Sequence, residues 1–454
     1  MSVSGLLNIA RDAITSNQIA INVTGANIAN VNTPGYTRQR AEFNAISSVD
    51  VSSGRADFGV SVDSIERLYN RYLETQIVDQ AQKAGYDEAR QEILGRVEGV
   101  FNESGDSGLS DSLSQFWNSW EALSSDPTSQ VARYSVVSAA SNLASLFREN
   151  SNVLSGVQQD IQDSMASTVE DINSITADIA VLNKQILASG AEDGSGNNLL
   201  DSRMELVKGL ADKINISYYE NSDGTLSVFL ANGNILVGGS SSEQLGVDNG
   251  DIFFKNNPDQ ALNDVITGGR LGGMIEMGEE TVSGYLDSLD QLANGIVIAV
   301  NDLHTTGLDA DGVIGAVFFD DLLPGAKNMR VSAAILDDPQ KIAASDNAGN
   351  KGENARLIGS VRDDLSMDGG ASTFNDYYAS LVGRVGFDVK AVDSSIERNT
   401  AVTNQLMAQR EEVSGVSLDE EVINLMKYQF GYNVAGRLAK TANDILDVLM
   451  ALGQ

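Results

Sequence analysis

The sequence predicts a mainly helical fold of the α+β class, in which a small antiparallel β domain is inserted into a bundle of long helices. Apolar residues recur in steps of three and four over long stretches, as they do on one face of a helix. Period-two alternation replaces this pattern between residues 214 and 255, where Asp-Gly and Asn-Gly pairs mark hairpin turns. The 454 residues include only 5 Pro and 6% aromatic side chains, which disfavours a β-sandwich throughout.

The N-terminal segment, residues 3–31, is predicted to be a helix with one strong apolar column. Leu7, Ile14, Ile21 and Ile28 follow one another at heptad spacing, and a second column is weaker. Burying these four side chains alone does not offset the conformational entropy lost when about 30 residues become ordered. The helix therefore needs a partner, and we expect the chain ends to be mobile in an isolated monomer.

The helix is predicted to end in a turn. Pro34 disfavours helical backbone at the residue before it, Gly35 can adopt positive φ, and Asn30 and Asn32 can bond to nearby backbone groups. Tyr36 follows directly. On pattern alone, an ordinary helix stop is the simpler interpretation of this stretch.

Residues 49–65 alternate between polar and apolar and predict a small β-hairpin, with its turn at residues 52–54. Helical spacing returns over residues 68–100, and a shorter helix with an aromatic face follows over 109–123. The strongest periodicity runs from 136 to 186, where one four-residue stutter favours a nearly straight helix about 75 Å long.

The β domain is predicted over residues 212–270, alone or together with 306–350, where residues 331–336 are a candidate strand. The glycine-rich residues 268–273 are interpreted as the hinge through which the chain leaves this domain. Helical columns resume at 282–303 and 378–413. We therefore expect a discontinuous antiparallel bundle built from residues 39–211, 271–305 and 351–413.

The last helix is predicted to begin at a capping box, in which Ser417 and Glu420 satisfy each other's backbone donors. Two apolar columns follow at heptad spacing, so this helix is the expected partner of the N-terminal one. The two would form an antiparallel coiled coil from residues 1–38 and 414–454. On pattern alone, such amphipathic ends fit an intramolecular core as well as a contact between copies.

The net charge of −33 excludes a typical nucleic-acid binder and disfavours anionic membranes. The acid excess lies almost entirely in residues 39–413, while the two ends are nearly neutral. The chain has no Cys, so thiol chemistry and thiolate metal sites are excluded. No stretch has the length and apolarity of a membrane span, and the N-terminus lacks the pattern of a cleaved signal.

Candidate catalytic and metal groups are few. His304 is the only histidine, and no nucleophile elbow precedes it, so a structural role at a helix end is expected. Residues 309–312 imitate the start of a calcium loop, but the glutamate that would complete the loop is missing, which favours a polar turn. Trp117 and Trp120 are expected to be core residues. We predict no catalytic residue, cofactor or metal.

Several segments resemble the bacterial flagellar rod, hook and hook-associated axial proteins. The superfamily resemblance lies in NIANVNTPGYTR at 27–38 and GVSVDSIER at 59–67. A narrower resemblance, to the hook-associated proteins that join hook to filament, lies in WNSWEALSSDP at 117–127, NNLLDSR at 197–203 and SGVSLDEE at 414–421. Both ends and most of the helical body are covered.

The resemblance implies a structural, non-enzymatic junction protein at the hook–filament boundary. It implies export through the flagellar type III apparatus without a cleaved signal, and an inner tube of paired terminal helices surrounded by the bundle, with the β domain outermost. The implied partners are further copies in a ring or short tube, hook protein, hook-associated protein 3, and an export chaperone on the C-terminal helix. Neither nucleic acid nor membrane is expected as a partner.

The predicted assembly interface combines the two terminal helices with the turn after the first. Its residues are Leu7, Ile14, Ile21, Ile28, Asn30, Asn32, Pro34, Gly35, Tyr36, Leu418, Leu425, Tyr432, Leu438, Ile445, Leu446 and Leu449.

Two alternatives stay open at this point. One is another axial protein of the same superfamily, namely a hook protein, a rod protein or hook-associated protein 3; the long helix at 136–186 argues against the first two. The other is a calcium-dependent secreted adhesin or enzyme carried on helical ends, which would depend on residues 309–312.

Overall fold

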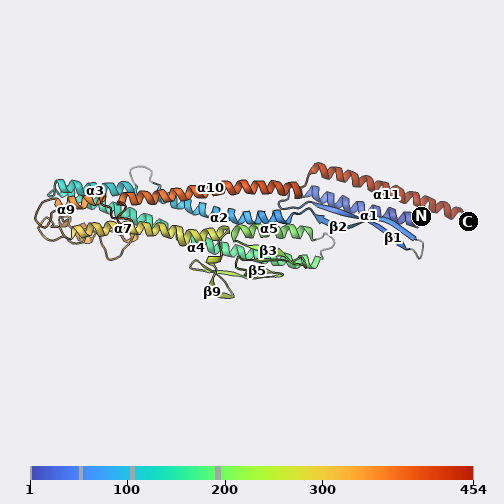
Figure 1. Ribbon diagram of the computed structural model, residues 1–454, viewed down its shortest axis with the longest axis horizontal. Helices are drawn as coiled ribbons and strands as arrows, with labels where there is room; N and C mark the ends of the chain where they lie inside the picture. Colours follow the sequence, from blue (N-terminus) through green and yellow to red (C-terminus); the bar gives the residue numbers. More distant parts are fainter. Residues whose placement is uncertain (1–2, 51–54, 103–107, 190–195, 453–454) are drawn as a thin grey trace.

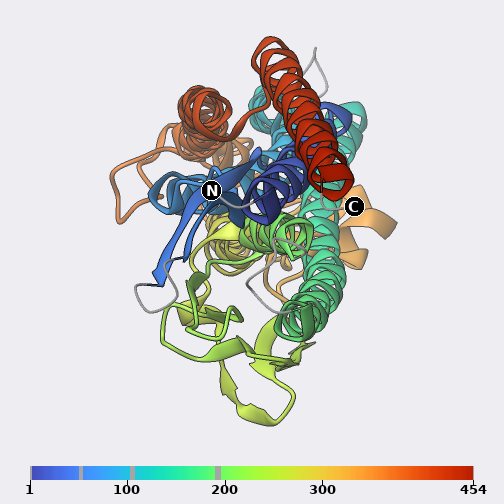
Figure 2. The same ribbon diagram turned by 90° about the vertical axis from the view of Figure 1, so that its right-hand side faces the viewer.

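The protein is a long rod in which both chain termini lie at the same end (Figure 1). The computed structural model describes residues 3–50, 55–102, 108–189 and 196–452. Long helices run along the rod, and short strands project from one side of it near the middle (Figures 1 and 2). This architecture confirms the predicted mainly helical fold with small antiparallel sheets.

Eleven α-helices are assigned within the described ranges. They are α1 (Val3–Ala29), α2 (Arg71–Phe101), α3 (Leu109–Ser125), α4 (Gln130–Ser189), α5 (Asn197–Lys213), α6 (Gly269–Glu276), α7 (Ser283–His304), α8 (Ala333–Asp337), α9 (Glu353–Ser360), α10 (Phe374–Ser414) and α11 (Leu418–Leu452). A π-helical stretch, Met277–Val282, joins α6 to α7. The long helices α4, α7 and α10 confirm the three predicted helical columns.

Helix α4 is the longest element and runs along much of the length of the rod. Its 60 residues correspond to about 90 Å of helix, and its buried side chains recur every three or four positions along its length. The predicted column from Val136 to Ile186 lies within it and is largely buried. Period and length together made this element predictable.

Helix α2 crosses its neighbours at glycines, which let the backbones approach closely. A Cβ atom on Gly85 would clash with the backbone carbonyl of Asp212 in α5, and one on Gly273 would lie 2.5 Å from the carbonyl oxygen of Tyr86. Gly273 belongs to α6, so the prediction of a hinge at residues 268–273 is wrong. These glycines permit close helix packing instead.

An aromatic core closes the end of the rod far from the termini. Trp117 and Trp120 of α3 are fully buried there, and Trp120 packs 5.1 Å from Phe318, measured between ring centroids. His304 at the end of α7 is also buried, which fits the structural role expected for it. The candidate strand at 331–336 is wrong, because Val331 makes only an isolated bridge to Phe319 and α8 begins at Ala333.

Two small antiparallel sheets form the predicted β insertion. The first has the order β3 (Ser217–Glu220), β4 (Leu226–Phe229), β5 (Ile235–Gly238) and β6 (Ser241–Ser242); the second has the order β7 (Leu245–Asp248), β8 (Asp251–Phe254) and β9 (Asn257–Ala261). Asparagines of α4 fasten both sheets. Asn183 donates to the carbonyl of Leu226 at 2.8 Å, and Asn173 donates to that of Leu245 at 2.9 Å.

A long antiparallel hairpin lies beside α1. Its strands are β1 (Gln39–Asp50) and β2 (Arg55–Arg67), and the register pairs Gln39 with Arg67 and Ala45 with Val60. The hairpin therefore begins ten residues earlier than the predicted segment at 49–65. The predicted turn at 52–54 lies outside the described residues. Both strands contact α1, so the hairpin packs with the terminal end of the rod.

Candidate assembly interface

The terminal helices α1 and α11 pair in antiparallel orientation beyond the end of the bundle (Figure 1). Their closest approach uses small residues: Ala10 and Ala20 of α1 and Ala435 and Ala442 of α11 are buried. A Cβ atom on Gly431 would lie 2.5 Å from Oδ1 of Asn17. The prediction that these helices pair is confirmed, but small side chains occupy the centre of the contact.

Most of the predicted interface residues of the N-terminal segment are neither fully buried nor fully exposed. The side chains of Leu7, Ile14, Ile21 and Ile28 are half-buried, as are Asn30, Gly35 and Tyr36, while Asn32 and Pro34 are exposed. The four aliphatic residues flank the small-residue seam and do not form its centre. They contribute to the helix pair and still present part of their surface to solvent.

The predicted residues of the C-terminal helix divide into two groups. Leu425, Leu438 and Leu446 are half-buried. Leu418, Tyr432, Ile445 and Leu449 are exposed. Within the described ranges, no neighbour covers the second group fully.

Exposed apolar side chains gather on the side of α11 that points away from α1, and sequence reasoning missed them. Ile423, Met426, Phe430 and Val434 follow one another at helical spacing, and Val448 lies on the same side further along, beyond Arg437 and Thr441. All five are exposed, Phe430 to 72% and Ile423 to 61%. We call these five residues the outer α11 face. Large exposed apolar patches mark interaction surfaces.

The turn after α1 leads the chain away from the helix pair. Gly35 has φ of +77°, which favours glycine, and a Cβ atom there would also meet the side chain of Glu205 of α5. The Asn30 side chain donates to the carbonyl of Ala26 at 2.9 Å and accepts from the hydroxyl of Thr33 at 3.2 Å. The local bonding expected of Asn30 is thus present.

Asn27 is the buried centre of the joint between the terminal helices and the hairpin. Its amide group donates to the carbonyl of Gln39 at 2.8 Å and to Oε2 of Glu421 at 3.1 Å. Its oxygen accepts from the Tyr36 hydroxyl at 2.9 Å and from the Gln39 amide at 3.0 Å. Burial, together with Asp201 and Glu421 nearby, raises the pKa of Tyr36 to about 12, so its hydroxyl stays a donor.

Arg38 ties the hairpin to the start of α11. Its guanidinium donates to Glu421 at 2.8 Å and to Glu420 at 2.7 Å, and its backbone amide donates to the carbonyl of Ser414 at 2.9 Å. The predicted capping box therefore forms only in part. Ser417 accepts from the Glu420 amide at 3.5 Å, but the Glu420 carboxylate bonds to Arg38.

Two more ion pairs fix the joint to the bundle. Arg410, near the end of α10, pairs with Glu74 of α2 at 2.8 Å, and both side chains are buried. Asp201 of α5 pairs with Arg67 at 2.6 Å and accepts from the Thr37 amide at 3.0 Å. Segments far apart in sequence thus meet through ion pairs of opposite charge. These pairs fix the position of the terminal helices relative to the bundle.

The groups weighed for chemistry have structural roles. The Nδ1 atom of His304 lies 2.6 Å from the carbonyl oxygen of Ala316, and its Nε2 accepts from the Ala343 amide at 2.9 Å. Burial lowers the pKa of His304 to about 4, so the ring is neutral. Oδ1 of Asp309 accepts from the amides of Asp311 and Val313, which makes residues 309–312 a polar turn.

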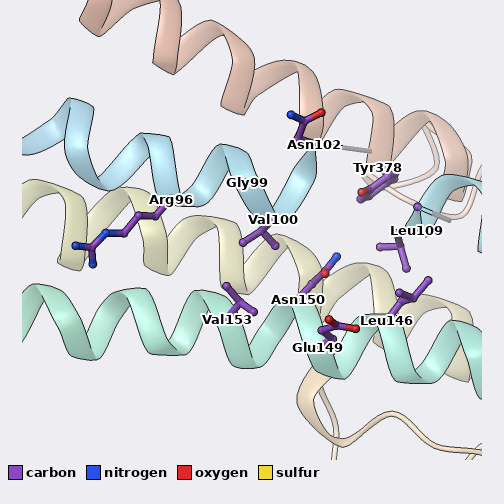
Figure 3. A pocket seen from close by; sticks show the side chains of 11 residues that line it. Arg96, Gly99, Val100, Asn102, Leu109, Leu146, Glu149, Asn150, Val153 and Tyr378 are labelled. Carbon is purple, nitrogen blue, oxygen red and sulfur yellow. The ribbon is translucent and has the colours of Figure 1, made fainter. Parts of the chain in front are cut away.

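No group of three acidic, histidine or cysteine side chains within the described ranges could hold a metal ion. In the part of the chain that the structure describes, no helix combines the length and apolarity that a membrane crossing requires. An open pocket of about 290 Å³ lies between α2 and α4, and Val100 of α2 and Val153 of α4 are among the residues that line it (Figure 3). It brings together no recognisable catalytic set.

Comparisons with known protein families match three parts of the chain. Residues 94–319 match the helical domain of flagellar hook-associated protein FlgK, residues 7–37 match the flagella basal body rod protein family, and residues 407–452 match the C-terminal family of flagellar basal body rod FlgEFG proteins. All three families are parts of the flagellum.

Relatives match along nearly the whole chain. Flagellar hook-associated protein 1 of Bacillus subtilis is 29% identical, over 97% of this chain and 96% of the relative, and that of Escherichia coli is 26% identical, over 99% and 100%. A solved structure of the flagellar hook junction protein FlgK from Burkholderia pseudomallei aligns with a TM-score of 0.68. It covers 75% of this chain and 100% of that one at 16% identity, which supports the fold. This chain belongs to the family of flagellar hook-associated protein 1.

Proposed function

We propose that this protein joins the flagellar hook to the filament and assembles with further copies through its terminal helices. The family is structural, and the chain is not an enzyme. The observation that carries the proposal is the outer α11 face, a run of exposed apolar side chains at the end of the rod that holds both termini. Exposure of such an apolar face to water is unfavourable in free energy, and neighbouring copies would cover it.

The arrangement of charge supports assembly at this end of the rod. Residues 1–38 and 414–454 are nearly neutral, while the rest of the chain carries almost all of the net charge of −33. Repulsion between copies is therefore weakest where the apolar face lies. Residues 1–38 and 414–454 would form the inner tube, the bundle of 39–211, 271–305 and 351–413 the next shell, and the β domain at 212–270 the outer surface.

The partners follow from this position. Hook protein would lie on one side of the junction, and hook-associated protein 3 on the other. Before assembly, an export chaperone would cover the C-terminal helix, because its outer face is apolar and is left exposed by the residues that the structure describes. Export would proceed through the flagellar type III apparatus, without a cleaved signal, to the hook–filament junction outside the cell.

The test replaces three residues of the outer α11 face in the full chain: Ile423→Ser, Phe430→Ser and Val434→Ser together. We expect normal hooks without filaments, and filament protein shed into the medium. The matched control replaces three exposed apolar residues at the opposite end of the rod, Val131, Leu322 and Leu323, by Ser. Filaments of normal number and length on cells with the α11 variant would refute the proposal.

A further inference from the structure

One stripe along the middle of α10 is basic in an otherwise acidic protein. At about 100° per residue, the positions within about 60° of Phe387 form one stripe from residue 380 to residue 409. Within these bounds the stripe holds Arg384, Lys390 and Arg398 and no acid, and Asp376 and Glu412 lie on the same side of the helix beyond its two ends. Phe387 at its centre is 71% exposed. We call this stripe the basic α10 face.

Two of these bases lack a charged partner among the described residues, although the chain has 63 acidic residues for 30 basic ones. Neither Lys390 nor Arg398 makes an ion pair with any residue that the structure describes. In the described part of the chain, the Arg384 side chain donates to the hydroxyl of Ser288 alone, at 3.2 Å. Cations left unpaired in so acidic a chain are available to a negatively charged partner.

A complementary face lies on α4. Between residues 149 and 178, the positions within about 60° of Glu149 hold six acids and no base. These acids are Glu149, Asp160, Asp163, Glu170, Asp171 and Asp178. Only two of them have a cationic partner among the described residues: Asp160 pairs with Arg96, and Asp171 with Lys213. We call this stripe the acidic α4 face.

The two faces lie on different sides of the rod at the same height. Figures 1 and 2 show α10 and α4 on different flanks, and α2 contacts both. Gln91 of α2 bonds to Asp393 of α10, and Arg96, five residues further along α2, pairs with Asp160 of α4. Residues 384–398 of α10 are therefore level with approximately residues 156–170 of α4.

We propose that the basic α10 face of one copy packs against the acidic α4 face of the next copy. A contact between two different faces repeats around an axis and closes a ring or builds a helical tube, whereas a contact between like faces stops at a dimer. Phe387 would contact the exposed Val153 of the neighbouring acidic face. The acidic stripe spans about 44 Å, so it accommodates copies that are displaced along the rod.

This lateral contact rests on the proposed function, since it operates only where copies lie side by side. It also answers a physical problem. Rods with a charge of −33 repel one another, and the apolar terminal helices alone would have to hold the copies together. Pairing the basic face with the acidic face converts part of this repulsion into attraction at the level of the bundle.

Charge reversal on each face, and on both together, tests the contact. Lys390→Glu with Arg398→Glu reverses the basic face, and Asp163→Lys with Glu170→Lys reverses the acidic face. The control is Lys255→Glu with Lys327→Glu. It makes the same change in charge as the basic-face variant, at two exposed positions outside both faces. All variants are expressed as full chains in a flagellated strain that lacks the native gene, and circular dichroism of the purified chains checks their folding.

We expect each single-face variant to lose most filament attachment, measured as the fraction of hooks that carry a filament. The variant with both faces reversed should recover attachment, and the control should match the native chain. Native attachment in both single-face variants, or no recovery in the double variant, overturns the lateral contact. The outer α11 face variant separates the two proposals, because the junction role fails only if that variant also attaches filaments normally.

Discussion

At the scale of single residues, the joint between the terminal helices and the rod depends on the hydrogen bonds of Asn27 and Arg38. Asn27 uses its amide nitrogen and oxygen for four hydrogen bonds, and Arg38 binds two adjacent carboxylates of α11. Removal of one partner would leave the other buried without compensation, which costs more than the loss of an exposed contact.

Glu420 and Glu421 allow a matched comparison, because both bind Arg38 from adjacent positions. The Glu421 side chain is 2% exposed, and that of Glu420 is 61% exposed. We expect Glu421→Ala to lower the local free energy of opening at the joint by about 3 kcal/mol. Glu420→Ala should lower it by less than about 1 kcal/mol. Hydrogen exchange of α1 amides measures both, and equal effects would contradict this account of the joint.

His304 gives a prediction about pH. The folded protein keeps the pKa of His304 near 4, below the ordinary value of 6.5, because the ring is buried and, as a smaller effect, the positive charge of Arg133 lies nearby. Between pH 6.5 and 4 the unfolded chain binds a proton that the folded chain does not. This histidine therefore makes the free energy of unfolding fall by about 3 kcal/mol as the pH drops through that window.

Because the chain has a single histidine, its ring gives a single set of NMR resonances. We expect these resonances to keep the shifts of a neutral imidazole from pH 7 down to pH 5. A titration with its midpoint near pH 6.5 would show that the ring is accessible to solvent.

At the scale of elements, the long helices were predictable because their apolar residues keep one period over many turns. The side of a terminal helix that faces its partner was harder to predict. Large aliphatic residues such as Ile14 and Ile21 mark an apolar face, but Ala20 and Ala435 are the buried positions, since small side chains allow closer approach. The hairpin's early start was missed because β1 alternates only weakly, and its stability depends on packing against α1.

The outer α11 face illustrates a second limit. A sequence pattern records that a residue is apolar, but it does not say whether the contact lies within the chain or between chains. Phe430 and Ile423 fall between the predicted columns, so only the structure reveals that they form one uncovered face. The ion pairs of the joint were equally hidden, because Glu74, Asp201 and Arg410 are distant in sequence.

Close helix packing predicts opposite effects for two glycines of α2. Gly85→Ala should destabilise the protein by about 1–3 kcal/mol, because the added methyl group meets the backbone of Asp212. Gly95→Ala should stabilise it by about 0.5–1 kcal/mol, because that position is exposed with open space around it. Thermal unfolding of the full-length variants measures the difference, and destabilisation by both substitutions would contradict this description of the α2–α5 contact.

At the scale of the whole molecule, the surface suited to assembly and the charged surface suited to water lie on different parts of the rod. Its terminal end carries the exposed apolar face and little net charge, its opposite end is closed by an aromatic core, and its β domain projects from one flank (Figures 1 and 2). Such a molecule is suited to stand with its terminal helices toward the axis of a tube. The central claim is that the outer α11 face is open in the monomer and covered in the flagellum.

Thiol labelling tests that claim directly, because the native chain contains no cysteine. Phe430→Cys reports on the outer α11 face, and Lys255→Cys reports on the β domain as a control. We expect a maleimide reagent to label both variants as purified monomers, but only Lys255→Cys in isolated hook–filament complexes. Equal labelling of Phe430→Cys in the monomer and in the assembled complexes would contradict the account.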